Sequence, residues 1–413
     1  MKQSGNPNRT ARLNLEGFNF GNLSGYSTED RLPEPPANRL LWRAIKRALL
    51  THHHEPDLEG ARVLYAAIAA HWLRDSPVWP MIVAPPGSMK TDLLAPLNGL
   101  EGVHLIDKLT PNTFLSGQVE DPKKRRTTSA SLLHRIGPSG IVVYSDFSTL
   151  TSMNRDHRAG VLADMRRIYD GHLRKEFGTG ENLTDREWRG RLTFVVAATP
   201  DIDRSYSVFQ ILGERFLMVR WHRPGGIEAA LKAMNQDTTL AKKELSEAVQ
   251  RMFKFVQAHI VEPGLTSEAQ HKIAALAEFA VRGRTHVPRS GYNKEIIYLP
   301  EPEAATRLAQ QLAQLTKGSA LLAGRSVAGV EDFRLAQRAA LDCIPASRRI
   351  VLDALMDGRT VGDVNLPKAT LHYAVEDLKS QGLIAGEGLS PLAMNLLNQA
   401  SLLLSPFTKC PSP

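Results

Sequence analysis

Cysteine is scarce in this chain, and long apolar runs are missing from it. The two cysteines, Cys343 and Cys410, lie far apart in the sequence. They support neither a disulfide framework nor a cysteine-based metal site, so we expect a reducing, cytoplasmic location. No apolar run reaches the ~18 residues that cross a bilayer, and residues 1–36 contain no hydrophobic segment of a secretory signal. We therefore expect a protein without a membrane partner.

The composition is that of a basic globular protein. Hydrophobic residues make up 42% and charged residues 23% of the 413 residues, a length that suits about two to four domains. The net charge of +8 permits binding to a polyanion. Basic residues gather at 123–126, 166–167, 174–175 and 282–289.

A histidine cluster occupies residues 52–54. Histidines that bind a metal usually share it with further ligands, and no cluster of carboxylates or cysteines accompanies these in the sequence. We therefore interpret the cluster as a solvated loop.

The most informative segment is a short Pro/Gly turn that joins an apolar run to a helix start. The run covers residues 78–83, and Ala-Pro-Pro-Gly-Ser-Met-Lys-Thr follows at 84–91. Strand, tight turn and Lys-Thr at a helix start are the layout of a phosphate-binding loop. Lys90 would contact the β- and γ-phosphates, and the Thr91 hydroxyl would hold Mg²⁺. The expected nucleotide-binding residues of this segment are Pro86, Gly87, Ser88, Met89, Lys90, Thr91 and Asp92.

Short apolar runs continue on the carboxyl side of this turn, separated by stretches with helical spacing of apolar residues. Strands that are linked through helices run parallel, so the pattern predicts an α/β sandwich. The runs lie at 78–83, 103–105, 140–144, 192–197 and 216–221.

Asp146 follows the apolar run at 140–144. A phosphate loop needs such a carboxylate at the end of a neighbouring strand, where it holds Mg²⁺ or positions the attacking water. The usual pair is Asp-Glu, and the residues leave two assignments open. In the pair Ser145-Asp146, Asp146 replaces the glutamate and Mg²⁺ loses a ligand. In the pair Asp146-Phe147 the glutamate is missing, and hydrolysis should be slow.

Two further elements follow in order along the chain. Thr199 comes just after the run at 192–197, where a polar side chain can hydrogen-bond the γ-phosphate or the water. Arg215 precedes the run at 216–221. An arginine at that place can reach the nucleotide of the next subunit and stabilise the transferring charge.

With these elements in this order, the chain resembles the AAA+ ATPases, most closely their minichromosome-maintenance-like branch and related ATP-binding proteins of phages and mobile elements. The resemblance covers residues 77–349 and implies a P-loop AAA+ three-layer sandwich with a parallel sheet and a helical lid. That branch also tolerates a non-glycine residue before the lysine, as at Met89. Its Asp-Glu-Phe-Asp-Lys-Met stretch is similar to residues 145–150, which favours Asp146 as the glutamate equivalent.

The resemblance also implies roles for the outlying polar residues. Thr199 falls at the sensor-1 position, and Arg215 matches the arginine finger. Residues 302–308 resemble the helix that carries the sensor-2 arginine, which would be Arg307. Residues 330–333 look like the start of the last lid helix.

A basic hairpin is a further part of the resemblance. Residues 164–177 are similar to a helix and β-hairpin that this branch inserts before sensor 1, and whose basic residues enter a central pore. Arg174 and Lys175 would then contact a nucleic-acid backbone without reading its sequence.

The segment 346–390 predicts a C-terminal winged helix-turn-helix, because a second short helix at 368–381 is followed by a strand-like stretch. Lys368 and His372 on that helix have side chains able to contact DNA. A protein-interaction module remains the alternative.

The chain is thus expected to divide into consecutive parts. They are an extended or disordered arm (1–36), N-terminal helices (37–75), the AAA+ α/β core (76–226), a helical lid (227–345), the winged helix (346–390) and a tail (391–413).

The leading hypothesis is a helicase-like ATPase that binds ATP and Mg²⁺ at the interfaces of a homo-oligomeric ring, expected to be a hexamer, and remodels DNA. Asp146, Thr199 and Arg215 would be catalytic, and Thr91 and Asp146 would hold the metal. One alternative is a slow ATP-dependent assembly switch that recruits a protein partner in a mobile-element or phage-defence system. Another is a winged-helix transcriptional regulator.

Overall fold

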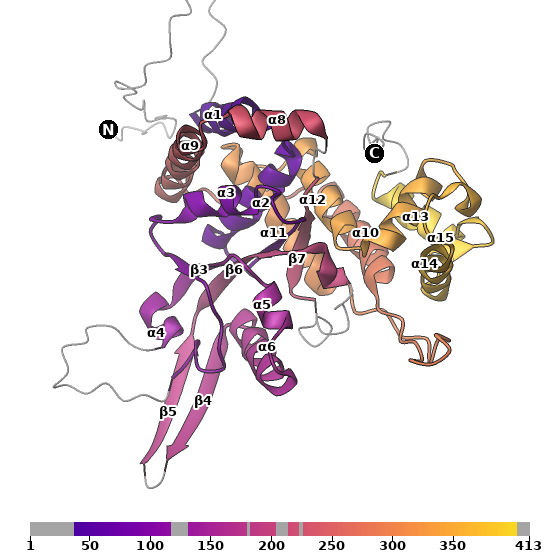
Figure 1. The fold of residues 1–413 in the computed structure, drawn as a ribbon, viewed down its shortest axis with the longest axis horizontal. Helices are drawn as coiled ribbons and strands as arrows, with labels where there is room; N and C mark the ends of the chain where they lie inside the picture. Colours follow the sequence, from indigo (N-terminus) through magenta and orange to yellow (C-terminus); the bar gives the residue numbers. More distant parts are fainter. Residues whose placement is uncertain (1–36, 117–130, 180–181, 204–213, 223–225, 403–413) are drawn as a thin grey trace, which may run out of the picture. The chain divides into compact units, whose positions relative to one another are not determined.

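The computed structural model describes residues 37–116, 131–179, 182–203, 214–222 and 226–402 (Figure 1). The expected arm, the basic stretch at 123–126 and the end of the tail from residue 403 lie outside the described residues. The strands are β1 (Trp79–Val83), β2 (Val103–Ile106), β3 (Ser139–Tyr144), β4 (His172–Thr179), β5 (Asn182–Arg189), β6 (Arg191–Ala198), β7 (Phe216–Arg220), β8 (Ile384–Ala385) and β9 (Gly388–Leu389).

Helices precede, separate and follow these strands. The α-helices are α1 (Ala37–His52), α2 (Leu58–Ala69), α3 (Lys90–Leu94), α4 (Leu132–Ile136), α5 (Ser148–Thr151), α6 (Arg155–Tyr169), α8 (Ile227–Asn235), α9 (Thr238–Ala258), α10 (Ser267–Arg284), α11 (Thr306–Leu322), α12 (Val330–Asp342), α13 (Ala346–Met356), α14 (Lys368–Ser380) and α15 (Pro391–Gln399). Short 3₁₀ turns are η1 (Ala70–Trp72), η2 (Ala95–Leu97), η3 (Pro200–Asp203) and η4 (Val361–Asp363). Within the described ranges, no helix has the length and apolar character needed to span a membrane.

The central feature is a five-stranded parallel sheet in the order β2-β3-β6-β1-β7. Each apolar run of the sequence forms one of these strands, so the predicted parallel α/β architecture is confirmed. All side chains of β1 are buried, as expected for a parallel strand that is covered on both faces. The order places β6 between β1 and β3. The segments that follow these three strands therefore meet at one edge of the sheet.

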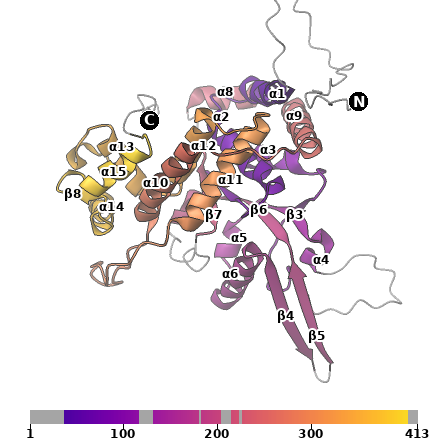
Figure 2. The same cartoon turned by 180° about the vertical axis from the view of Figure 1, so that it is seen from behind.

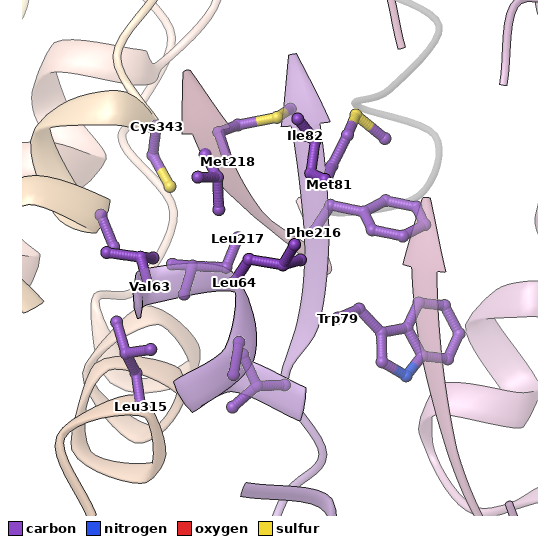
Figure 3. Close-up of a cluster of buried hydrophobic side chains, with 14 of the residues drawn as sticks. Val63, Leu64, Trp79, Met81, Ile82, Phe216, Leu217, Met218, Leu315 and Cys343 are labelled. Atoms are coloured by element: carbon purple, nitrogen blue, oxygen red, sulfur yellow. The ribbon is translucent and has the colours of Figure 1, made fainter. Parts of the chain in front are cut away.

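Aromatic packing fixes the start of β1. The Trp79 ring lies edge-on to Phe194 of β6, with ring centroids 4.8 Å apart, and to Tyr169 of α6 at 5.0 Å. Its indole N–H donates to the Leu192 carbonyl at 2.7 Å. On the other face of the sheet, Leu64 of α2 and Leu315 of α11 contribute to the same buried cluster (Figure 3). Burying a side chain of this size stabilises the fold by roughly 2–3 kcal/mol.

The segment after the sheet is mainly helical, as predicted for 227–345. Helix α9 packs on α1, and α11 packs on α2, which ties this segment to the N-terminal helices. One long connection interrupts the helices between α10 and α11. It is held by an isolated bridge between Arg289 and Ile296.

The predicted helix and hairpin between Asp146 and Thr199 are confirmed. Helix α6 is followed by the antiparallel pair β4–β5, which lies outside the main sheet (Figure 2). Its base is anchored by two buried side chains, Leu173 and Trp188. The Trp188 indole N–H donates to the Gly137 carbonyl at 2.7 Å.

The C-terminal segment contains α13 and α14, the short hairpin β8–β9 and a further helix. The sequence predicts a tail from residue 391, and this is wrong for α15. The Ser390 hydroxyl caps that helix by accepting from the Ala393 N–H at 3.0 Å, and Pro391 occupies its first turn. The buried Leu396 and Leu397 lie on this helix, which packs on α10. The residues assigned to the tail from the sequence therefore include a capped helix with a short apolar stripe.

Candidate nucleotide-binding site

The turn between β1 and α3 has two residues in the left-handed backbone region. Gly87 has φ +73°, and Met89 has φ +61°. Glycine adopts this conformation without strain, whereas methionine pays about 1 kcal/mol or more. The positive φ explains why a glycine usually precedes the lysine. Met89 adopts the same backbone conformation with some strain. Ala84 extends the ladder of β1, because its N–H donates to the Ala198 carbonyl at 3.1 Å.

Lys90 folds back over this turn. Its ammonium donates hydrogen bonds to the carbonyls of Ala84, at 2.5 Å, and Pro85, at 3.2 Å. Burial lowers the pKa of Lys90, and the negative charge of Asp146 opposes that shift. The lysine and the carboxylate are therefore close enough to interact, although they come from strands that are not neighbours.

The turn after β3 holds Asp146 in place. Phe147 is buried, and its N–H donates to the Ala197 carbonyl of β6 at 2.8 Å. The Asp146 carboxylate itself is exposed and accepts from the backbone N–H of Ser148 at 3.0 Å and from the Ser148 hydroxyl. Its other oxygen has no hydrogen bond among the described residues that would compete with a ligand.

Thr199 lies next to this turn. With Phe147, Ser148 and Thr151 it lines a cavity of about 170 Å³. The structure thus places three predicted residues, Lys90, Asp146 and Thr199, at the carboxyl edge of β1, β3 and β6.

Most of the remaining loop residues line a second cavity. Gly87, Ser88, Met89 and Asp92 line this cavity of about 330 Å³, whereas Pro86 and Thr91 are exposed. The Ser88 hydroxyl is buried and has no hydrogen-bond partner among the described residues. A buried polar group without a partner costs free energy, so a ligand that supplies one is favoured here.

The histidine cluster forms another wall of the 330 Å³ cavity, together with Lys232 of α8. His52 is buried and forms a 2.8 Å hydrogen bond with Glu244 of α9. Burial lowers the pKa of His53 despite the nearby charge of Asp92. The interpretation as a solvated loop is therefore wrong for His52. No sequence signal assigned these histidines to the site, because the fold alone brings α1, α8 and the loop together.

The donor set suits Mg²⁺ that arrives with a nucleotide. No group of three or more histidine, cysteine, aspartate or glutamate side chains that could hold a metal ion occurs in the part of the chain described here. Mg²⁺ bound to nucleotides needs only one or two protein oxygens, because phosphates and waters complete its shell. Thr91 and Asp146 fit that requirement.

Arg215 lies at the opposite edge of the sheet, just before β7. Its side chain is only 9% exposed and donates two 3.1 Å hydrogen bonds to the Asp170 carboxylate. Its guanidinium also lies 5.4 Å from the centre of the Tyr169 ring. The structure does not bring Arg215 to Lys90 of the same chain.

Arg307 shares that edge. It lies in the first turn of α11, is partly exposed and lies 3.7 Å from Glu303. Together with Tyr169 and Asp170 it lines a cavity of about 1150 Å³. Both predicted arginines are thus separated from the phosphate loop of their own chain by the length of the strands.

The hairpin presents its two predicted basic residues differently. Arg174 is exposed, 3.7 Å from Glu176. Lys175 points to the other face of β4, where it pairs with Asp164 of α6 and donates to the Pro111 carbonyl at 2.8 Å. Alternation along the strand causes this difference. Arg174 is therefore the more exposed of the two predicted basic residues.

On α14, Lys368 and His372 are both exposed, and the His372 ring lies 3.9 Å from Glu376. Arg289, which the sequence left unassigned, contacts this helix through Glu376 at 2.7 Å and Asp377 at 2.5 Å.

Comparison of the sequence with models of known protein families and with curated proteins finds no match.

Proposed function

We propose that this protein is a Mg-ATP-dependent ATPase of the AAA+ type that assembles head to tail and acts on DNA. One observation carries the proposal. The sheet order β2-β3-β6-β1-β7 brings the Lys-Thr turn after β1, the polar residue after β6 and the carboxylate after β3 to one edge. Phosphoryl transfer to water needs these three groups within reach of one γ-phosphate.

Each residue has a role at that edge. Lys90 leaves the carbonyls of Ala84 and Pro85 and neutralises the β- and γ-phosphate oxygens. Thr91 and Asp146 would hold Mg²⁺, which would offset the negative charge that develops on the phosphates. Asp146 also orients the attacking water, and Thr199 hydrogen-bonds the γ-phosphate. The cavity walled by His53 and Asp92 then accommodates the nucleoside.

The arginines support assembly. Arg215 and Arg307 lie at the far edge of the sheet, so they serve the nucleotide of a neighbouring copy rather than their own. To reach that nucleotide, Arg215 must first break its hydrogen bonds with Asp170. The release of Arg215 from Asp170 would therefore be a step of the catalytic cycle.

DNA is the substrate that the remaining basic residues favour. Arg174 on the hairpin is exposed, and α13, α14 and β8–β9 form two helices followed by a small hairpin, as in winged helices. Lys368 and His372 lie on the exposed side of its second helix.

A second candidate is a slow ATP-dependent assembly switch. The positive φ of Met89 and the serine before Asp146 favour it, because both features weaken catalysis more than binding. Turnover distinguishes the two candidates.

The decisive experiment is steady-state ATP hydrolysis with and without single- and double-stranded DNA. Lys90→Ala should abolish turnover, whereas Lys254→Ala, an exposed lysine on α9, should leave it unchanged. DNA-stimulated turnover supports the motor, and ATP binding without turnover supports the switch. Equal turnover by wild type and Lys90→Ala would refute the site.

A further inference from the structure

Helix α8 presents an apolar stripe that no part of the described structure covers. Ile227, Leu231 and Met234 lie on one face at helical spacing, and the first and last of them are each 73% exposed. The helix has no buried residue. It is nevertheless fixed in place, because the Lys232 ammonium donates to the carbonyls of Leu50 and His53, both at 2.8 Å. An ordered helix with an exposed apolar face indicates an interaction surface.

The connection between α10 and α11 presents a second apolar surface. We call residues 289–299 the tyrosine loop, because Tyr292, 98% exposed, and Tyr298 are displayed there with Ile297 and Leu299. Exposed tyrosines on a rigid support bind partners at a low cost in conformational entropy.

The tyrosine loop is held rigid by its own hydrogen bonds and by α14. The Ser290 N–H donates to the Glu295 carbonyl at 2.9 Å, and the Ile297 N–H donates to the Pro288 carbonyl at 3.0 Å. Arg289 pairs with Glu376 and Asp377. An anchored loop that displays several apolar side chains to water is typical of an interaction surface.

The two surfaces flank the two separated halves of the proposed ATPase site. Helix α8 lines the cavity beside the phosphate loop. Glu303 follows the tyrosine loop in the sequence and pairs with the buried Arg284. Arg284 also pairs with Glu214, which directly precedes Arg215. One surface therefore accompanies Lys90, and the other accompanies the arginines.

The helices next to α8 carry more exposed bases than acids. Lys46 and Arg47 lie on α1, and Lys242 and Lys243 lie on α9 together with the exposed Glu244 and Glu247, while Glu228 lies on α8 itself. The tyrosine loop and its continuation carry the exposed Glu295 and Glu301, while the Lys294 ammonium turns onto the Gly291 carbonyl at 3.1 Å. Complementary rims steer two surfaces together and fix their register.

We infer that the tyrosine loop of one copy of this chain docks on the α8 stripe of the next copy. The contact is heterologous, since the two surfaces differ, and repetition of it closes a ring or continues as a filament. The inference rests on the proposed function, which requires the arginines of one copy to reach the nucleotide of the next. The proposed contact brings Arg215 and Arg307 of one copy toward the phosphate loop of its neighbour.

The test uses full-length chains with one surface damaged in each. Leu231→Asp places a charge in the stripe, and Tyr298→Asp places one in the tyrosine loop. Val330→Asp is the matched control, because Val330 is an exposed apolar residue on another helix. Sedimentation velocity with and without Mg-ATP gives the assembly state, and circular dichroism checks that each variant is folded.

Wild type and Val330→Asp should assemble, and either surface variant alone should sediment as a monomer, because its association is weakened by more than about tenfold. An equimolar mixture of the two variants should form a dimer and stop there, because each copy keeps one intact surface. A mixture that stays monomeric, surface variants that assemble like wild type, or a wild type that is monomeric under every condition would each overturn the inference.

Nucleotide binding separates this inference from the proposed function. A fluorescent ATP analogue is titrated into the same samples. Chains that assemble as described without binding the analogue would refute the ATPase and leave the interface standing. Monomeric variants that bind the analogue as wild type does place the defect in assembly alone.

Discussion

Arg220 forms two hydrogen bonds with Asp203, at 2.8 and 2.7 Å. Arg220 ends β7, and Asp203 ends η3, the turn that begins directly after Thr199. The Asp203 carboxylate also accepts from the Ala346 N–H at 3.4 Å, at the start of α13. The turn that contacts the γ-phosphate in the proposed site is therefore bonded directly to the C-terminal helices.

Asp203→Asn should weaken this connection. The pair is largely buried, and its loss leaves Arg220 without its bidentate partner, so we expect about 2 kcal/mol lower free energy of unfolding. Urea denaturation measures the effect. The exposed Asp107→Asn is the matched control, and equal stability of the two variants would remove Asp203 from this role.

Arg215→Ala should retain ATP binding and lose hydrolysis by about a hundredfold or more, as expected when a group that stabilises transferring charge is removed. Arg215 also pairs with Asp170, so the experiment must distinguish a structural role of Arg215 from a catalytic one. Asp170→Asn breaks that pair and leaves the arginine, so it should keep hydrolysis. Equal losses in both variants would assign Arg215 to structure.

Mixing the Lys90→Ala and Arg215→Ala variants should restore part of the ATPase activity. A Lys90→Ala copy keeps its arginine, and an Arg215→Ala copy keeps its phosphate loop, so a mixed assembly contains complete sites. Turnover by the mixture above the sum of the separate variants is the expected result. Strict additivity would mean that the arginine acts within its own chain or not at all.

Met89→Gly should stabilise the phosphate turn and raise turnover, because glycine adopts a positive φ without strain. Met89→Ala is the control, since it shortens the side chain and keeps the backbone strain. We expect Met89→Gly to be more stable than Met89→Ala by roughly 0.5–1 kcal/mol. The reverse order in thermal unfolding would show that Met89 acts through packing instead.

His71 should make the protein sensitive to acid. Burial, and then the charge of Arg191, lower its pKa from 6.5 to about 3, and its ring hydrogen-bonds Thr193 at 3.0 Å. Between these two pH values the unfolded histidine binds a proton that the folded one does not. Stability contributed by neutral His71 is therefore complete above pH 6.5 and declines as the pH falls, by up to about 1.4 kcal/mol per unit.

His71→Gln removes the titration and should flatten this decline, although it lowers stability at pH 8. Urea unfolding between pH 5 and 8 compares it with His157→Gln, an exposed histidine on α6. An unchanged pH slope in His71→Gln would assign the acid sensitivity to other groups.

The sequence was sufficient to predict the sheet and one half of the candidate site. The strands are near-continuous apolar runs because both faces of a parallel sheet are covered, and residues that follow such strands must meet at one edge. The sequence therefore predicted that Lys90, Asp146 and Thr199 lie at the same edge of the sheet.

The rest depended on contacts between distant segments. Nothing in the sequence pairs Lys175 with Asp164, or Arg215 with Asp170, because each pair is set by how α6 lies against β4 and β7. The same holds for His53, which reaches the loop only through the packing of α1. Helix α15 was missed because its apolar stripe is short and its cap is a single serine.

The anchored lysine of the hairpin has a mechanical consequence. Lys175 ties β4 to Asp164 in the middle of α6, and the same helix ends at Tyr169, next to the carboxylate that holds Arg215. If the proposed function holds, a force that DNA exerts on the hairpin would pass through α6 to Asp170, the partner of Arg215. One helix would then couple the load on the hairpin to the release of the arginine.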